Sequence, residues 1–95
     1  MPTSLGRVAT DAAPRYAKQL ASHFGGKIPT EETRDGGHRL TFQQTDVLLE
    51  PADDHLLIRV TAPDASSLTA IESVVGSHLE RFGRRNELTV VWEQS

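Results

Sequence analysis

The feature that most constrains the fold of this chain is the spacing of its apolar residues, which is helical near both ends and alternating in the middle. Over residues 12–24 the apolar side chains recur at intervals of three and four, and the same intervals return over residues 64–82. Such intervals place apolar side chains on one face of an amphipathic helix. The sequence therefore predicts two helices, over residues 12–24 and 64–82.

Residues typical of helix ends bound both predicted helices. Thr10 and Asp11 stand before the first helix, where either side chain can cap it, and two consecutive glycines follow it. Asp64 opens the second helix and Gly83 ends it. Short oxygen-bearing side chains accept hydrogen bonds from the first free N–H groups, and glycine adopts the backbone conformation that helix ends favour.

The remaining segments are short and alternate apolar with polar residues, which is typical of half-buried strands. Turn residues separate the central ones, with Gly36 and Gly37 in one turn and Asp53 and Asp54 in another. Glycine and aspartate suit hairpin turns because they adopt positive φ or bond to their own backbone. The four central strands are therefore expected to form an antiparallel meander. The predicted strands cover residues 7–10, 28–33, 38–43, 46–51, 55–61 and 88–92.

These segments give the order β-α-β-β-β-β-α-β along the chain. Each helix and most strands have one apolar face, so two layers are enough to bury them. We expect an α+β two-layer sandwich, with both helices on one face of a mainly antiparallel sheet of five to six strands. A length of 95 residues suits a single domain over residues 1–95. The expected core includes Leu20, Phe24, Leu40, Phe42, Ile58, Ile71, Val75, Phe82 and Val90.

The composition excludes several classes of protein. Cysteine is absent, which excludes disulfides, thiolate metal sites and cysteine nucleophiles. The first residues have neither the basic lead nor the apolar run of a signal peptide, and no stretch reaches membrane-spanning length. A net charge of −3 gives no long-range attraction for nucleic acid. We therefore expect a cytoplasmic protein that binds neither membranes nor nucleic acid.

The sequence contains no recognisable catalytic or nucleotide-binding motif. Glycine-rich phosphate loops, zinc-protease histidine pairs and nucleophile elbows are all missing. Ser77, which precedes His78, lies within a predicted helix and not on a turn between strand and helix. We therefore assign no catalytic residue, expect a protein that is not an enzyme, and identify no cofactor.

Two of the four histidines lie on the predicted helices. His78 falls near the middle of the apolar face of the second helix, and His23 lies at the edge of that of the first, in line with Tyr16 and Gln19. If both helices pack on one face of the sheet, the two histidines can approach one another. In one interpretation each imidazole forms a hydrogen bond with a backbone carbonyl or with a hydroxyl such as that of Tyr16. In the other, Tyr16, Gln19, His23 and His78 bind a ligand or a metal ion. The spacing does not identify a metal.

Basic residues gather after both helices. Arg81, Arg84 and Arg85 surround the end of the second helix, and Lys27 follows the first. Cations at the C-terminus of a helix complement its dipole. The alternative is that these four side chains contact an anion or an acidic partner.

Three strings in the chain resemble a known family. They are RYAKQLASHF at residues 15–24, VVGSHLERF at residues 74–82, and the Leu-x-Val-x-Trp pattern that ends at Trp92. Together they resemble the uncharacterised bacterial family called domain of unknown function 2218, over essentially the whole chain. Members of that family look like stand-alone proteins or domains fused to siderophore-interacting flavin reductases. The resemblance implies a role in iron handling by association, with such a reductase as a partner.

The same resemblance bears on the candidate site. His23 and His78 match histidines in the strings of the family. Gly26 stands where many relatives have a second histidine before the lysine that is Lys27 here. A metal site built on two histidines of the first helix is therefore not expected.

Three functions remain open at this point. The first is a small non-enzymatic binding or accessory module of bacterial iron or siderophore metabolism, with a pocket between the helices and the sheet edge. The second is a direct haem or metal-ion binder, or an enzyme that uses His23 as an acid or base beside Tyr16. The third is a structural domain that binds a partner at an exposed sheet edge.

Overall fold

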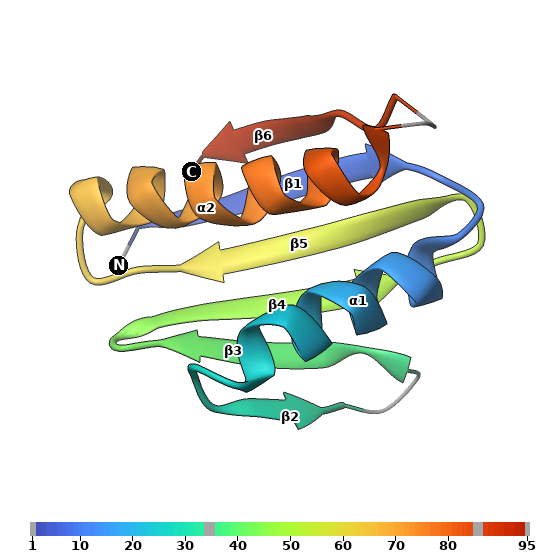
Figure 1. Cartoon of the computed structure of the whole chain (residues 1–95). Coiled ribbons are helices and arrows are strands. Elements are labelled where there is room, and N and C mark those ends of the chain that lie inside the picture. Colours follow the sequence, from blue (N-terminus) through green and yellow to red (C-terminus); the bar gives the residue numbers. More distant parts are fainter. Residues whose placement is uncertain (1, 34–35, 85–86, 95) are drawn as a thin grey trace.

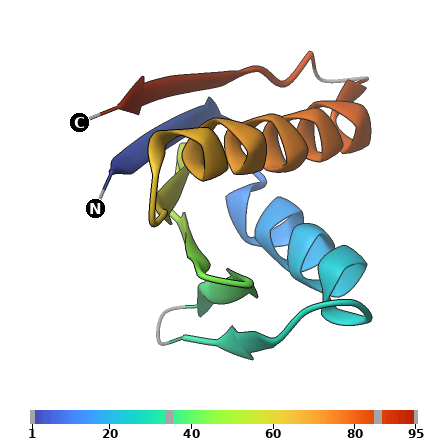
Figure 2. The same cartoon turned by 90° about the vertical axis from the view of Figure 1, so that its left-hand side faces the viewer.

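Six strands form one antiparallel sheet, and both helices lie on the same face of it (Figure 1). The computed structural model describes residues 2–33, 36–84 and 87–94. The elements follow one another in the order β-α-β-β-β-β-α-β. Figure 2 shows the two helices side by side in one layer next to the sheet. The predicted α+β sandwich of two layers is therefore confirmed.

The elements lie close to their predicted positions. Strand β5 has the predicted bounds, and each helix begins one residue later than predicted. The helices are α1 (Ala13–Gly25) and α2 (Ala65–Phe82). The strands are β1 (Thr3–Ala9), β2 (Thr30–Glu32), β3 (His38–Phe42), β4 (Thr45–Pro51), β5 (His55–Thr61) and β6 (Val90–Gln94).

Two strands begin later than predicted because the turn before each extends further. The N–H of Ile28 donates to the carbonyl of Phe24 at 3.0 Å, so Ile28 belongs to the turn that leaves α1 and not to β2. The N–H of Leu88 donates to the carbonyl of Gly83 at 3.3 Å in the same way, so β6 begins two residues later than expected.

Strand β1 is longer than predicted and begins at Thr3. Its face toward the helices consists of Ser4, Gly6 and Val8, all buried. A serine and a glycine do not produce the apolar alternation that marks a half-buried strand. The sequence signal was therefore limited to the last part of this strand.

The strand order across the sheet is β2-β3-β4-β5-β1-β6. Strands β2 to β5 form the predicted antiparallel meander. Strand β1 pairs with β5 on one side, where Val8 is opposite Leu56, and with β6 on the other, where Val8 is opposite Val90. The two edges of the sheet are β2 and β6. Residues 34 and 35 of the first predicted turn lie outside the described residues. In the second predicted turn the N–H of Ala52 donates to the carbonyl of His55 at 2.8 Å.

The two helices begin differently. At α2 the predicted cap is confirmed, because the carboxylate of Asp64 accepts a hydrogen bond from the N–H of Ser67 at 2.7 Å. At α1 the prediction of a Thr10 or Asp11 cap is wrong, because Ala12 occupies the cap position and no side chain caps the helix. The hydroxyl of Thr10 instead accepts from the N–H of Ala12 at 3.0 Å, which stabilises the turn before the helix.

Most of the predicted core is buried between the sheet and the helices. Three of its members are only partly buried and pack at the margin of the core: Phe42, Ile71 and Phe82. For these three the prediction of core membership is confirmed only in part, because they also line openings at the surface beside α1 and α2. The confirmed members are Leu20, Phe24, Leu40, Ile58, Val75 and Val90. Neither helix has the length and hydropathy that crossing a bilayer requires, within the described residues.

Candidate functional site

The imidazoles of His23 and His78 lie against each other between the two helices. His23 is in the last turn of α1 and His78 is in the second half of α2. Their ring centroids are 4.7 Å apart, with 45° between the ring planes. The expectation that packing both helices on one face brings these residues together is therefore met.

Phenylalanine rings surround this histidine pair. Phe24 packs edge-on against His78, with centroids 5.1 Å apart, and Phe82 packs edge-on against His23 at 5.5 Å. Phe42, from β3, packs edge-on against Phe24 at 5.1 Å. Edge-to-face contacts are a favoured geometry for aromatic rings. We call these five residues the aromatic cluster, and they hold both imidazoles in defined positions.

The ring of His78 is oriented by the backbone of its own helix. Its Nδ1 lies 2.7 Å from the carbonyl oxygen of Val74. Because a carbonyl only accepts, Nδ1 carries the hydrogen, and Nε2 of the neutral ring has a free lone pair. In the described part of the chain no hydrogen bond reaches Nε2, and no buried side-chain nitrogen or oxygen there lacks a partner. Nε2 is therefore not fully buried, and it is able to accept a bond.

A groove of about 450 Å³ opens beside this pair, and we call it the helix groove. One wall comes from α1, whose groove-facing residues share the intervals of three and four that define one helix face. The other wall is Phe82 of α2. The lining residues are Arg15, Lys18, Gln19, Ser22, His23 and Phe82.

The four predicted ligand-binding residues do not share one environment. Gln19 and His23 are exposed and line the helix groove. His78 is half-buried and reaches the groove through its contact with His23. Tyr16 is 5% exposed and belongs to the core cluster. Tyr16 is not one of the residues that line the helix groove.

Two cations of the helix groove were missed by the sequence reasoning, which considered only those after the helices. Arg15 and Lys18 line the groove. Arg15 lies four residues before Gln19, and Lys18 lies four residues before Ser22, so both cations belong to the face of α1 that lines the groove. That periodicity was the signal that could have identified them. Lys27, Arg81 and Arg84 are exposed and do not line the groove. Arg85 lies outside the described residues.

The histidine pair is a small set of potential metal ligands. Across residues 2–33, 36–84 and 87–94, no group of three or more histidine, aspartate or glutamate side chains could together hold a metal ion. A metal ion at His23 and His78 would need its other ligands from water or from a bound molecule.

A second pocket lies at the opposite end of the aromatic cluster. It has a volume of about 400 Å³, and Phe42 of the aromatic cluster is one of its lining residues. It lies between α2, the β3–β4 turn and the segment that leaves α1. The lining residues are Ile28, Phe42, Gln43, Thr45, Ser67, Ala70 and Ile71.

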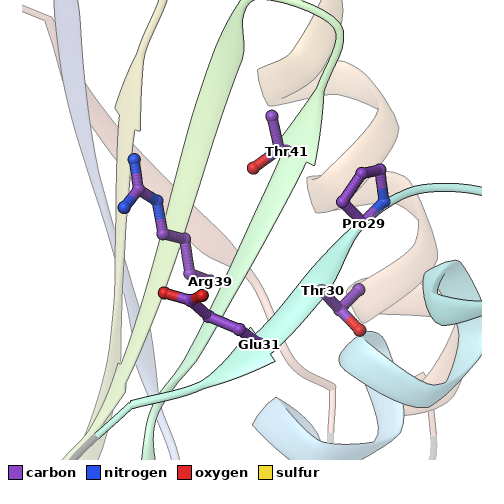
Figure 3. Close-up of a pocket in the computed structure, with 5 residues that line it drawn as sticks. All are labelled: Pro29, Thr30, Glu31, Arg39 and Thr41. Atoms are coloured by element: carbon purple, nitrogen blue, oxygen red, sulfur yellow. The ribbon is translucent and has the colours of Figure 1, made fainter.

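A smaller pocket of about 200 Å³ lies at the β2 edge of the sheet (Figure 3). Glu31 and Arg39 extend beside each other there from paired strands, with Pro29 and Thr41 toward the other end. The guanidinium of Arg39 donates to Asp46 at 2.9 Å, and this bond raises its pKa. Both charged side chains are about half exposed. An exposed pair of this kind contributes little energy, so we interpret this pocket as charged surface.

Comparison with known proteins shows what this chain resembles. A family model described as "Uncharacterized protein conserved in bacteria (DUF2218)" matches residues 5–93. The solved NMR structure of PA4090 from Pseudomonas aeruginosa is similar, with 31% sequence identity and a TM-score of 0.82 over 98% of this chain and 96% of that one. No curated protein matches the chain. The chain belongs to DUF2218, a bacterial family of uncharacterised proteins.

Proposed function

We propose that this chain is a small non-enzymatic binding module that holds an anionic ligand with a planar group in the helix groove. One observation carries the proposal. The exposed ring of His23, held in place by His78 and Phe82, lies in a groove whose α1 wall also presents Arg15 and Lys18. Aromatic surface and positive charge therefore meet in one opening.

The chemistry of the lining supports this class of ligand. A planar group can stack on the imidazole of His23 or the ring of Phe82. A carboxylate or phenolate can accept charge-assisted hydrogen bonds from Arg15 and Lys18. A groove of about 450 Å³ falls in the size range of small-molecule sites.

The same lining favours binding over catalysis. The groove contains no carboxylate, and its hydroxyl belongs to Ser22. In the part of the chain that the structure describes, no hydrogen bond links Ser22 to a histidine, as activation of a nucleophile requires. The phenol of Tyr16 is buried, which disfavours an enzyme that uses His23 beside Tyr16.

A second function, direct binding of haem or of a transition-metal ion, is favoured by the orientation of His78. Metal-ligating histidines commonly donate one ring N–H to a backbone carbonyl, as His78 does to Val74. Two imidazoles bound in cis to one non-haem ion, with metal–nitrogen bonds of about 2.1 Å, have centroids roughly 5 Å apart. The observed separation is 4.7 Å. Haem has room for one of the two histidines on each side of its plane, so it would use a single imidazole of this pair. His23 and His78 are therefore the residues to test as ligands.

The proposed process is bacterial iron and siderophore metabolism, with a siderophore-interacting reductase as a protein partner. This part of the proposal rests on the family resemblance described above and on no contact in the structure. Anionic aromatic chelators and haem both have the chemistry that the helix groove favours.

The test of the anion site uses an aromatic carboxylate, 2,3-dihydroxybenzoate, and follows thermal stability of the purified protein. A ligand that binds only the folded state raises the melting temperature, and the stabilisation grows with the logarithm of the ratio of ligand concentration to Kd. We expect stabilisation that is lost in the Arg15→Ala, Lys18→Ala double variant. Arg59→Ala is the matched control, because Arg59 pairs with Glu50 outside the groove. Absence of stabilisation, or equal loss in the control, contradicts the anion site.

The test of direct ligation titrates the protein with haem and, separately, with Zn²⁺ and Cu²⁺. Ligation of haem by one imidazole shifts the Soret band, and we expect that shift to disappear in His23→Ala or His78→Ala. His55→Ala is the control, because His55 pairs with Asp54 at 2.6 Å at the start of β5. If neither haem nor either ion changes the spectrum or the melting temperature, the hypothesis of direct ligation is wrong. That result does not affect the anion site, which the titration with 2,3-dihydroxybenzoate tests separately.

A further inference from the structure

The backbone hydrogen bonds at the two ends of β1 define which of its residues face each neighbouring strand. The N–H of Thr10 donates to the carbonyl of Asp54 at 3.1 Å, and the carbonyl of Pro2 accepts from the N–H of Ala62 at 3.1 Å. Both bonds reach across to the β5 side. Because backbone groups alternate in direction along a strand, the even-numbered residues of β1 bond toward β5 and the odd-numbered ones toward β6.

This alternation fixes the outward groups of β6, the edge strand beyond β1. Arg7 is opposite Val91, so Val91 bonds toward β1. The even-numbered residues Val90, Trp92 and Gln94 therefore direct their N–H and C=O groups away from the sheet. The N–H of Val90 donates to the carboxylate of Glu80 at 3.3 Å. No acceptor for the N–H of Trp92 or Gln94 is found among the residues that the structure describes.

The two edges of the sheet differ in how they are protected. Strand β2 is three residues long, and all three are exposed, two of them being Glu31 and Glu32. Short length and charge both prevent an edge strand from pairing with another chain. Strand β6 has five residues, of which Glu93 is the one charged residue, and Val91 at its centre is 67% exposed, an exposed large apolar side chain. Only the β6 edge is suited to strand addition.

We propose that β6 pairs antiparallel with β6 of a second copy of this chain, about a two-fold axis at Val91, so that two six-stranded sheets join. In this register Val91 meets its own symmetry mate, and Val90 lies opposite Trp92 of the second copy. Thr89 lies opposite Glu93, which joins a hydroxyl to a carboxylate. The even-numbered residues then form hydrogen-bonded pairs, as the direction of their backbone groups requires.

The side chains favour this register and this occupant. Over residues 89–93 every directly opposed pair is apolar with apolar or hydroxyl with carboxylate, and no like charges face each other, which would be destabilising. Gln94 lies opposite Leu88, which precedes the strand. A register centred on Trp92 would place Val91 opposite a carboxylate. An isologous contact of this kind needs one patch that complements itself, which β6 provides. In the dimer the N–H of Val90 donates to the backbone carbonyl of Trp92 in the second copy, and this bond replaces the long hydrogen bond to the carboxylate of Glu80.

The contact is small, so the dimer is expected to form reversibly and at high concentration, since an interface well below about 1,200 Å² is typical of weak complexes. Sedimentation equilibrium between about 10 μM and about 1 mM covers the range of such dissociation constants. The mass is expected to rise from 10.4 kDa toward twice that value. Amide chemical shifts that change with concentration are expected along β6.

Substitutions at the two edges separate this proposal from other modes of association. Val91→Lys places a charge at the exposed centre of the contact and should abolish association without changing the melting temperature. Glu31→Lys, at the β2 edge, is the matched control and should associate like the parent chain. A mass of 10.4 kDa throughout, association of Val91→Lys equal to that of the parent, or shift changes elsewhere in the sheet would overturn the proposal.

Discussion

The indole of Trp92 lies directly over the α-carbon of Gly6, its cross-strand partner in β1. A β-carbon at Gly6 would be 2.8 Å from Cζ3 of that ring, closer than side chains approach in folded proteins. On its other side the indole lies near Gly76 of α2, where a β-carbon would be 3.5 Å from Nε1, an ordinary contact. Two glycines that touch one ring therefore differ in how much space they leave.

Gly6→Ala should destabilise the protein, because the methyl group must displace the indole or the strand. Overpacking of this kind typically costs about 1–3 kcal/mol. Urea unfolding followed by the fluorescence of Trp92, the single tryptophan, measures the change. Gly76→Ala is the control and should be neutral or stabilising by up to about 1 kcal/mol, because alanine has the higher helix propensity. Equal effects of the two substitutions would contradict the close approach at Gly6.

Phe24→Ala should cost more stability than Phe82→Ala. Phe24 is 6% exposed and contacts three other aromatic rings, so its loss leaves a cavity worth about 3–5 kcal/mol. Phe82 is only partly buried at the rim of the helix groove, and about 1–2 kcal/mol is expected. Thermal or urea unfolding of both variants tests the order. A larger loss for Phe82 would place it in the core and not at the groove.

The cap of α2 should make stability depend on pH in acid. The backbone N–H of Ser67 bonds the Asp64 carboxylate and holds its pKa below the usual 3.8. A lowered pKa stabilises the folded state above the unfolded value, and this contribution is lost as pH falls through the folded pKa. Melting temperatures measured from neutral pH down to about pH 2 should fall less steeply for Asp64→Asn, which keeps a capping oxygen without the charge. An identical slope would contradict the assignment.

His78 should be protonated at Nδ1 in its neutral form. The carbonyl of Val74 can only accept, so the hydrogen between them belongs to the ring. Long-range ¹H–¹⁵N spectra at a pH where imidazoles are neutral distinguish the two nitrogens. We expect Nε2 to show the shift of an unprotonated nitrogen, and a protonated Nε2 would show that His78 does not bond to Val74.

Periodicity was enough to predict the helices and the meander, because in those segments local spacing and burial agree. It was not enough for β1, whose buried face includes Ser4. The hydroxyl of Ser4 donates to Glu72 of α2, and Gln94 of β6 donates to the same carboxylate at 3.1 Å. This polar contact joins three distant segments, and nothing local in the sequence signals it. The strand order was unpredictable for the same reason.

The candidate site was predicted where it depends on helix faces. The apolar faces of the two helices were enough to bring His23 and His78 together. They were not enough to place Tyr16, whose side chain turns inward although it lies close to the line of His23. Arg15 and Lys18 were overlooked because surface cations on a helix usually have no partner but water. Arg15 and Lys18 line a groove only because Phe82 of α2 forms its other wall, and this contact between helices is not visible in the sequence of α1 alone.

The position of β1 inside the sheet governs when this fold can be completed. Val8 pairs with Leu56 on one side and Val90 on the other, so the first strand made is enclosed by the last one. Contacts so distant along the chain slow folding, because long loops must close before the pairing is gained. On a ribosome the meander and α1 can pack early, whereas β1 keeps one side open, with Gly6 uncovered, until Trp92 has emerged.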